Sequence, residues 1–218
     1  MPRTPYSDEE VATRRNAILD AAMELHDEGG VAALSFRNIA ARLGFSYATP
    51  YRYFASKEAL LTALRARVFR WMEGILMDAV ERAPDPMRKL EALAGAYVRA
   101  GIDKPSRYAL MFFRNDELSR EPRSLELVAA KRDALDVCTR VVAAAQEAGV
   151  LRLSVDPLTA AHLFWASAHG MVSLQVAGQF VMGRSLEALI PEMIATFLAG
   201  LERRADQDAV DAPRYRMT

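Results

Sequence analysis

Residues 35–61 decide the fold, and they read SFRNIAARLGFSYATPYRYFASKEALL. Ser35 can cap a short helix, because its hydroxyl can accept from an amide of the first turn, and Gly44 can end that helix. Between these residues the apolar side chains recur at the spacing of one helical face: Phe36, Ile39, Ala40 and Leu43. A brief second helix is expected over 47–54. Two short helices joined by a turn follow the plan of a helix-turn-helix motif, here at 35–54, whose second helix enters the major groove of DNA.

The charge of this segment differs from that of the whole chain. The 218 residues carry 28 basic and 28 acidic side chains, so the composition gives no hint of an anionic partner. Residues 35–57 carry no acidic side chain and four basic ones: Arg37, Arg42, Arg52 and Lys57. Such a local patch is typical of a DNA-binding surface. The alternative interpretation is that Arg37 and Arg42 are solvated surface charges.

Three tyrosines lie among these charges: Tyr47, Tyr51 and Tyr53. A phenol can donate to a phosphate oxygen and can also pack against a sugar. The tyrosines therefore favour a nucleic-acid interface at this segment. Tyr53 could instead pack against the first helix.

Helix start and stop signals recur along the rest of the chain, and no stretch shows the period-two alternation of half-buried strands. Ser7 and Glu10 form a capping box for the first helix, which the pair at 29–30, Gly-Gly, should end. Further helix starts are expected at Ser56, Asp85, Pro105, about Pro122, Asp156 and Ser185, with a loop at Arg114–Arg123. Pro191 predicts a kink in the last helix or a later start. The sequence therefore predicts an all-α fold of about nine helices, an N-terminal three-helix domain with the helix-turn-helix motif plus a C-terminal helical bundle.

Cysteine usage and the chain start favour a cytoplasmic location. Cys138 is the single cysteine, so no internal disulfide can form, and Met1–Glu10 is polar where a signal peptide would need an apolar run. Pro157–Gly183 contains no Lys, Arg, Asp or Glu and is long enough to span a bilayer. Because it contains His, Gln, Ser and Thr and has no flanking basic cluster, we expect a buried helix and no membrane partner.

The run at 35–61 resembles the N-terminal signature of TetR-family transcriptional regulators, and the resemblance extends over about residues 8–80. Its most diagnostic part is the spacing of Tyr51, Phe54, Lys57 and Leu60. The resemblance implies that the early residues of the second helix face the bases and that the following Tyr and Lys bind phosphates. Together with the exposed charges, this gives the following predicted DNA-binding residues: Arg37, Ser46, Tyr47, Ala48, Thr49, Tyr51, Arg52, Tyr53 and Lys57.

Two residues depart from the family pattern. Ala48 occupies a position where glycine is common, and Pro50 a position where leucine is usual. Pro50 has no amide donor and a fixed φ. Either Thr49 caps a helix that begins at Pro50, or the first turn from Tyr47 is distorted.

A second resemblance covers about residues 85–203. The segment HLFWASAHGMVSLQVAGQF at 162–180 resembles the C-terminal domain of one TetR subgroup, the Trp-His-Gly type, through Trp165, His169 and Gly170. The resemblance implies a homodimer formed by the last two helices, which would supply two readers for a palindromic operator in double-stranded DNA. We therefore divide the chain as follows: a DNA-binding domain at 8–60, a connecting helix at 61–84, a ligand-binding and dimerisation domain at 85–203 and a flexible tail at 204–218.

A small apolar effector is the partner expected of such a domain. The candidate pocket residues are Tyr97, Tyr108, Met111, Phe112, Trp165 and His169. The alternative is that these side chains are ordinary core. The overall hypothesis is a homodimeric repressor that an effector releases from its operator.

The sequence offers little for other chemistry. His162 and His169 are seven residues apart, about 10 Å along a helix axis, which is too far to share one metal ion, so neither a metal site nor a cofactor is expected. No catalytic motif is present, and Cys138 has no basic neighbour that would lower the pKa of its thiol. The alternatives to a ligand-responsive repressor are a small helical ligand-binding protein or enzyme, and an architectural DNA-binding protein without an effector.

Overall fold

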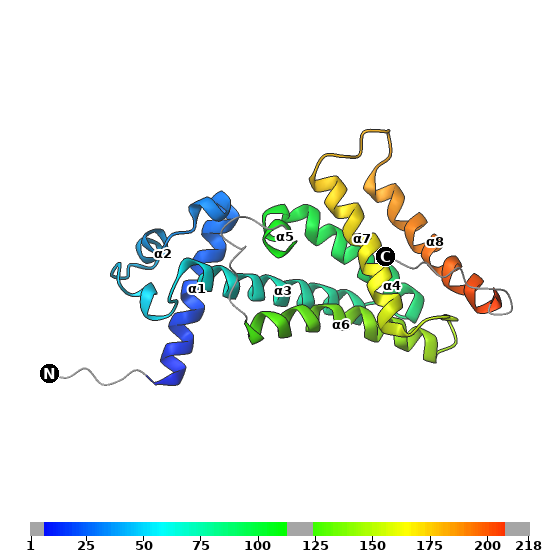
Figure 1. The fold of residues 1–218 in the computed structure, drawn as a ribbon, viewed down its shortest axis with the longest axis horizontal. Helices are drawn as coiled ribbons and strands as arrows, with labels where there is room; N and C mark the ends of the chain where they lie inside the picture. Colours follow the sequence, from blue (N-terminus) through cyan, green and yellow to red (C-terminus); the bar gives the residue numbers. More distant parts are fainter. Residues whose placement is uncertain (1–6, 113–123, 208–218) are drawn as a thin grey trace, which may run out of the picture. The chain divides into compact units, whose positions relative to one another are not determined.

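The computed structural model describes residues 7–112 and 124–207, with side chains up to residue 200. Its helices are α1 (Asp8–Ala33), α2 (Phe36–Leu43), the 3-10 helix η1 (Pro50–Arg52), α3 (Lys57–Glu81), α4 (Pro86–Asp103), α5 (Pro105–Phe112), α6 (Leu125–Glu147), α7 (Pro157–Val176) and α8 (Leu186–Gln207) (Figure 1). Within the described ranges these eight α-helices and one 3-10 helix account for all regular structure. The prediction of an all-α fold is confirmed.

Side-chain caps fix the helix starts where the sequence predicts them. The Ser7 hydroxyl accepts from the Glu10 amide at 3.2 Å, and the Glu10 carboxylate accepts from the Ser7 amide at 2.8 Å, which completes the capping box. Ser35 caps α2 through the amide of Asn38 at 3.1 Å, and Ser56 caps α3 through the amide of Ala59 at 3.2 Å. These caps place both ends of the candidate DNA-binding segment.

Several boundaries differ from the expectation. The helix α1 is not ended by its glycine pair but kinked there, with φ of −145° at Gly29 and +64° at Gly30, and it continues to Ala33. The helix α8 begins at Leu186, so Pro191 lies inside it and the expected later start is wrong. The predicted loop at 114–123 and the part of the tail beyond Gln207 lie outside the described residues.

The chain divides into two compact units. The N-terminal unit contains the chain up to Trp71 together with Lys104–Lys131, and the C-terminal unit contains Met72–Asp103 and the chain from Arg132 onward. The helix α5 therefore groups with α1, α2 and the first part of α3. In the N-terminal unit the core residues Ile18, Ala22, Ile39, Leu60 and Leu64 have no exposed surface.

In the C-terminal unit, α7 and α8 lie side by side and are joined by a loop at 177–185 (Figure 1). The helix α7 buries one face: Ala160, Ala161, Phe164, Ala168 and Val172. Its other face is open to solvent although it carries no charge, and it includes Leu158, Leu163 and Leu174, each about half exposed. Within one chain this face of α7 is therefore not buried, and the expectation of a buried helix stays a prediction that depends on the dimer. No helix among the described residues is long and apolar enough to cross a membrane.

Candidate functional site

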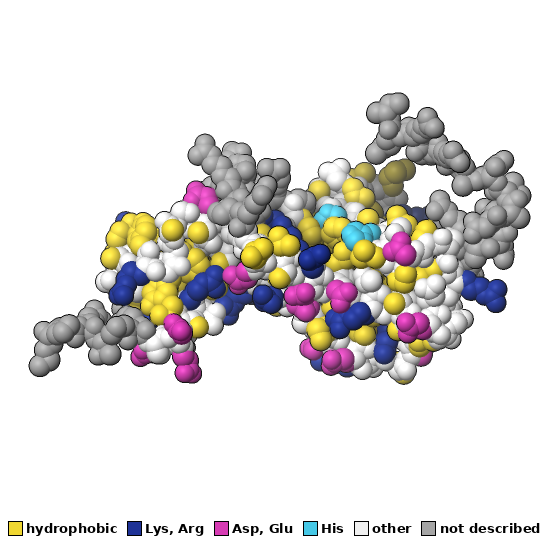
Figure 2. Space-filling view, turned by 60° about the horizontal axis from the view of Figure 1, so that its bottom comes forward, with side chains coloured by type: hydrophobic (Ala, Val, Ile, Leu, Met, Phe, Trp, Pro, Cys, Tyr) yellow, Lys and Arg dark blue, Asp and Glu magenta, His cyan; other side chains and the backbone are white. Residues whose placement is uncertain are grey.

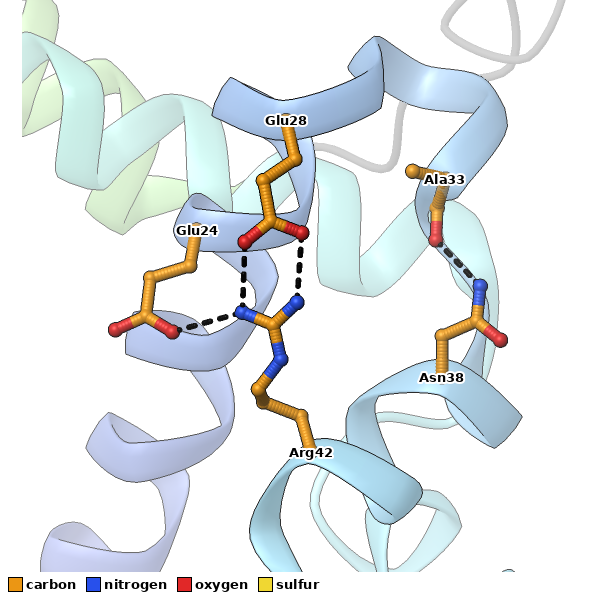
Figure 3. Close-up of polar contacts among 5 residues, drawn as sticks. All are labelled: Glu24, Glu28, Ala33, Asn38 and Arg42. Atoms are coloured by element: carbon orange, nitrogen blue, oxygen red, sulfur yellow. Dashed lines mark hydrogen bonds and ion pairs between the residues drawn. The ribbon is translucent and has the colours of Figure 1, made fainter.

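Arg42 is not part of an exposed basic patch, because α1 neutralises it. One guanidinium nitrogen donates to Glu24 at 3.1 Å and to Glu28 at 3.0 Å, and a second donates to Glu28 at 2.6 Å (Figure 3). The hydrogen bonds from Glu28 and Glu24 raise the pKa of Arg42, and the Arg42 hydrogen bonds lower the pKa of Glu28. The interpretation of Arg42 as a contributor to the patch is wrong, because its partners come from the preceding helix.

A second contact between the same helices fixes α2. The side-chain amide of Asn38 donates to the carbonyl of Ala33 at 2.9 Å (Figure 3). The apolar side chains Phe36, Ile39 and Ala40 of α2 are buried. The helix α2 is therefore held on α1 by both polar and apolar contacts, and its exposed side carries Arg37.

The predicted second helix at 47–54 does not form as a regular helix. A turn comes first, in which the Thr49 amide donates to the Ser46 carbonyl at 2.9 Å, and the 3-10 helix η1 begins at Pro50. The Thr49 hydroxyl makes no capping bond and instead meets the Ser46 hydroxyl at 2.8 Å. Of the two expectations, the distorted first turn is confirmed and capping by Thr49 is wrong. The physical reason is Pro50, which lacks the amide that an α-helix from Tyr47 would need.

Solvent reaches all of the predicted DNA-binding residues. Six are exposed, namely Arg37, Ser46, Tyr47, Ala48, Tyr51 and Arg52, and three are half-buried, namely Thr49, Tyr53 and Lys57. They come from α2, the turn at 46–49, η1 and the start of α3. The structure therefore brings the predicted residues onto one continuous part of the chain without burying any of them.

The turn and η1 carry a hydrogen-bonded tyrosine pair that the sequence did not indicate. The hydroxyls of Tyr47 and Tyr51 are 3.2 Å apart and their ring centroids 5.7 Å apart. The Tyr51 ring packs edge-on against Phe36, with centroids 4.4 Å apart. The hydrogen bond with Tyr47 raises the pKa of Tyr51.

Within the N-terminal unit α5 is joined to α1 and to α3. Arg107 of α5 donates through Nε to both carboxylate oxygens of Asp27 on α1, at 3.0 and 3.1 Å, and lies 5.1 Å from the ring of Trp71. Arg65 of α3 donates to the carbonyls of Leu110 and Met111 at 3.0 and 2.9 Å. Because these carbonyls belong to the last turn of α5, the buried Arg65 satisfies acceptors that the helix itself leaves open.

The candidate pocket residues divide between the two units. Tyr108, Met111 and Phe112 belong to the N-terminal unit, where Tyr108 is fully buried and its ring lies 4.9 Å from Phe112. Tyr97, Trp165 and His169 belong to the C-terminal unit and form a hydrogen-bonded cluster there.

The direction of one hydrogen bond in this cluster is fixed by its donor. Trp165 donates to the Tyr97 hydroxyl at 3.2 Å, and that hydroxyl lies 3.2 Å from Nδ1 of His169. The indole nitrogen can only donate, so the Tyr97 hydroxyl accepts from Trp165, and Nε2 of His169 lies 3.4 Å from the Ser173 hydroxyl. Burial lowers the pKa of His169, which favours the neutral imidazole.

Little in the described residues suggests catalytic or metal chemistry. Burial raises the pKa of the Cys138 thiol to about 12, so it is not a thiolate nucleophile at neutral pH. In the parts of the chain that the structure describes, no group of three or more His, Cys, Asp or Glu side chains could hold a metal ion. Figure 2 shows Lys and Arg side chains interspersed with Asp and Glu over the face drawn, in keeping with the equal numbers of 28 basic and 28 acidic residues.

Two family models match the chain. The model described as bacterial regulatory proteins, tetR family, matches residues 18–64, and the model described as tetracyclin repressor-like, C-terminal domain, matches residues 90–197. The first match contains the whole candidate DNA-binding segment. The second covers the predicted regulatory domain, and the resemblance to the Trp-His-Gly subgroup stays a prediction.

Individual relatives and structures agree with these matches. The regulator BetI of Rhizobium meliloti (strain 1021) is 31% identical over 121 residues, which is 55% of this chain and 60% of BetI. The repressor KstR of Mycobacterium tuberculosis (strain ATCC 25618 / H37Rv) is 33% identical over 87 residues, 40% of each chain, so the match spans about half the length of these curated relatives. A solved structure of a protein with unknown function from Rhodococcus sp. RHA1 aligns with a TM-score of 0.73 at 28% identity over 91% of this chain and 99% of that one.

Proposed function

Because the chain belongs to the TetR family of bacterial regulatory proteins, we propose that it is a homodimeric repressor that a small apolar effector releases from a palindromic operator. It is a DNA-binding transcriptional regulator, like the relatives it matches, and not an enzyme. The observation that carries the proposal is the solvent-accessible segment from Arg37 to Lys57, held on α1 by the Arg42 ion pairs and the Asn38 hydrogen bond.

The DNA contacts follow from exposure and charge. The solvent-accessible turn at 46–49 would supply the groups that face base edges: Ser46, Ala48 and Thr49. Arg37, Arg52, Tyr53 and Lys57 surround it and bind phosphates. Lys57 is also the first residue of α3, where the helix amides favour an anion.

The homodimer is supported by the uncharged, exposed face of α7. An apolar helix face is stabilised when a second surface removes it from water. A second copy of this uncharged face can cover it without burying a charge. A dimer also supplies the paired readers that a palindrome requires. Leu163→Asp should therefore yield a monomer in sedimentation experiments, whereas Val11→Asp, at an exposed apolar residue of α1, should leave the dimer intact. A dimer that tolerates Leu163→Asp would contradict this interface.

The effector proposal rests on the cluster of Tyr97, Trp165 and His169, which offers polar groups within an otherwise apolar environment. A ligand that binds one conformation more tightly by a few kcal/mol would change operator occupancy about a hundredfold. Release can arise only from such a difference in affinity.

The decisive experiment has two stages. Selection from random duplex DNA, followed by footprinting, should yield a palindrome whose two halves are each protected. The bound operator is then exposed to a library of small apolar compounds, and release by any one of them supports the repressor. Absence of a selected sequence would refute the operator, and an operator that no compound releases would favour an architectural DNA-binding protein.

A further inference from the structure

We propose that Tyr47 and Tyr51 act together as one binding site for a single DNA phosphate, rather than separately as a base reader and a phosphate contact. This inference rests on the proposed binding of DNA and assigns the chemistry of one part of that surface. The observation behind it is that the two hydroxyls are 3.2 Å apart and bonded to each other.

The spacing of the hydroxyls suits one shared acceptor group. Two hydroxyls 3.2 Å apart can both reach acceptors that are close neighbours. The two non-bridging oxygens of one phosphodiester are such neighbours, because they share one phosphorus atom.

The exchange of hydrogen bonds also favours an anion. In the free protein one hydroxyl donates to the other, and a phenol can rotate its hydrogen without moving its oxygen. When both donate to a phosphate, one neutral hydrogen bond at the surface is replaced by two charge-assisted ones, which are about twice as strong each. Because the pKa of Tyr51 is raised, its phenol carries the hydrogen that it donates to the phosphate.

The position of the pair in the fold points the same way. Tyr51 is held by the buried ring of Phe36, which is the first residue of α2, and exposed Arg37 follows it. An arginine carried by the same short helix favours an anion over a neutral base edge in this part of the surface. Tyr47 is 58% exposed and has no such aromatic support of its own, so Tyr51 is also the positioning residue for Tyr47.

The test combines protein and DNA variants. The selected operator and a random duplex are titrated with wild-type protein, Tyr47→Phe, Tyr51→Phe and the double variant. We expect each single variant to bind both duplexes about fivefold to tenfold more weakly without a change in base preference. The double variant should lose less than the product of the two single losses, because each hydroxyl positions the other.

A methylphosphonate scan of the operator locates the partner. At one phosphate per half-site, removal of the negative charge should weaken the wild type but leave the double phenylalanine variant unchanged. A scan without such a phosphate would overturn the proposal, as would a Tyr47→Phe variant that changes preference at one base pair. If the wild type selects no DNA sequence, the operator proposal fails as well. If an operator is selected but neither tyrosine substitution weakens binding to it, this inference alone is overturned.

Discussion

Replacing Arg107 by Met should destabilise the N-terminal unit by about 2–3 kcal/mol. The side chains of Arg107 and Asp27 are 18% and 24% exposed, so most of the water around this pair is excluded. Breaking a fully buried pair by removing one partner costs about 3–5 kcal/mol, and the residual exposure here lets water recover part of that cost. The lost contact of Arg107 with Trp71 is worth about 0.5–1 kcal/mol at such a site.

The assay is thermal and denaturant unfolding followed by circular dichroism. For a chain of this size, 2–3 kcal/mol corresponds to a decrease of about 4–12 °C in Tm. Asp27→Asn combined with Arg107→Met should be less damaging than the sum of the single changes, with a coupling of about 1–2 kcal/mol. Arg88→Met, which removes a cation from an exposed pair with Glu91, is the matched control and should leave Tm unchanged.

The size of the coupling decides between two accounts. A coupling below about 0.5 kcal/mol is what an exposed ion pair gives, and it would refute the view that Asp27 and Arg107 join α1 to α5. A large decrease in Tm for Arg88→Met would equally show that the difference in exposure between the two pairs has no consequence.

Three further changes have defined outcomes. Lys57→Ala should weaken binding to the operator and to random DNA alike, and it should lower the slope of log affinity against log salt concentration by about 1. The control Lys89→Ala on α4 should change neither the affinity nor the slope. A changed base preference for Lys57→Ala would contradict the phosphate role. Pro50→Leu restores an amide at residue 50, so we expect more helical signal in circular dichroism and selection of a different operator sequence. The control Pro86→Ala at the start of α4 should select the wild-type operator. An unchanged operator for Pro50→Leu would show that the turn does not set base preference. Burial lowers the pKa of His26 below its usual 6.5, so the unfolded chain binds more protons and the free energy of unfolding decreases as the pH falls below 6.5. His26→Gln should reduce this decrease, whereas His162→Gln, at an exposed histidine, should not. Equal pH dependences of stability for the two variants would contradict this role of His26.

Local signals predicted the helix starts because capping is chemistry within four residues. Ser7, Ser35 and Ser56 each bond an amide three positions later, and that relation can be read directly from the sequence. The candidate DNA-binding segment was found in the same way, from turn residues and a local run of charge.

The errors came from partners that the local sequence does not contain. Arg42 has no acid within the segment, yet α1 supplies Glu24 and Glu28 once the helices are packed. Pro50 was noted as a departure, but the 3-10 geometry and the tyrosine pair depend on how the shortened element closes onto Phe36. Which face of α7 stays open within one chain could not be predicted, because hydrophobicity alone does not say which surface covers a helix.

The neutralisation of Arg42 has a kinetic consequence for the search along DNA. Sequence-independent attraction to the duplex grows with every cation that displaces a counterion, and a guanidinium already held by two carboxylates displaces little. A regulator with such a paired arginine dissociates from wrong sequences sooner, because less of its binding free energy is independent of sequence. Its residence time then depends more on the shape and hydrogen bonds of the right site. The two ion pairs between α2 and α1 thereby shorten each stay on a wrong sequence without contacting a base.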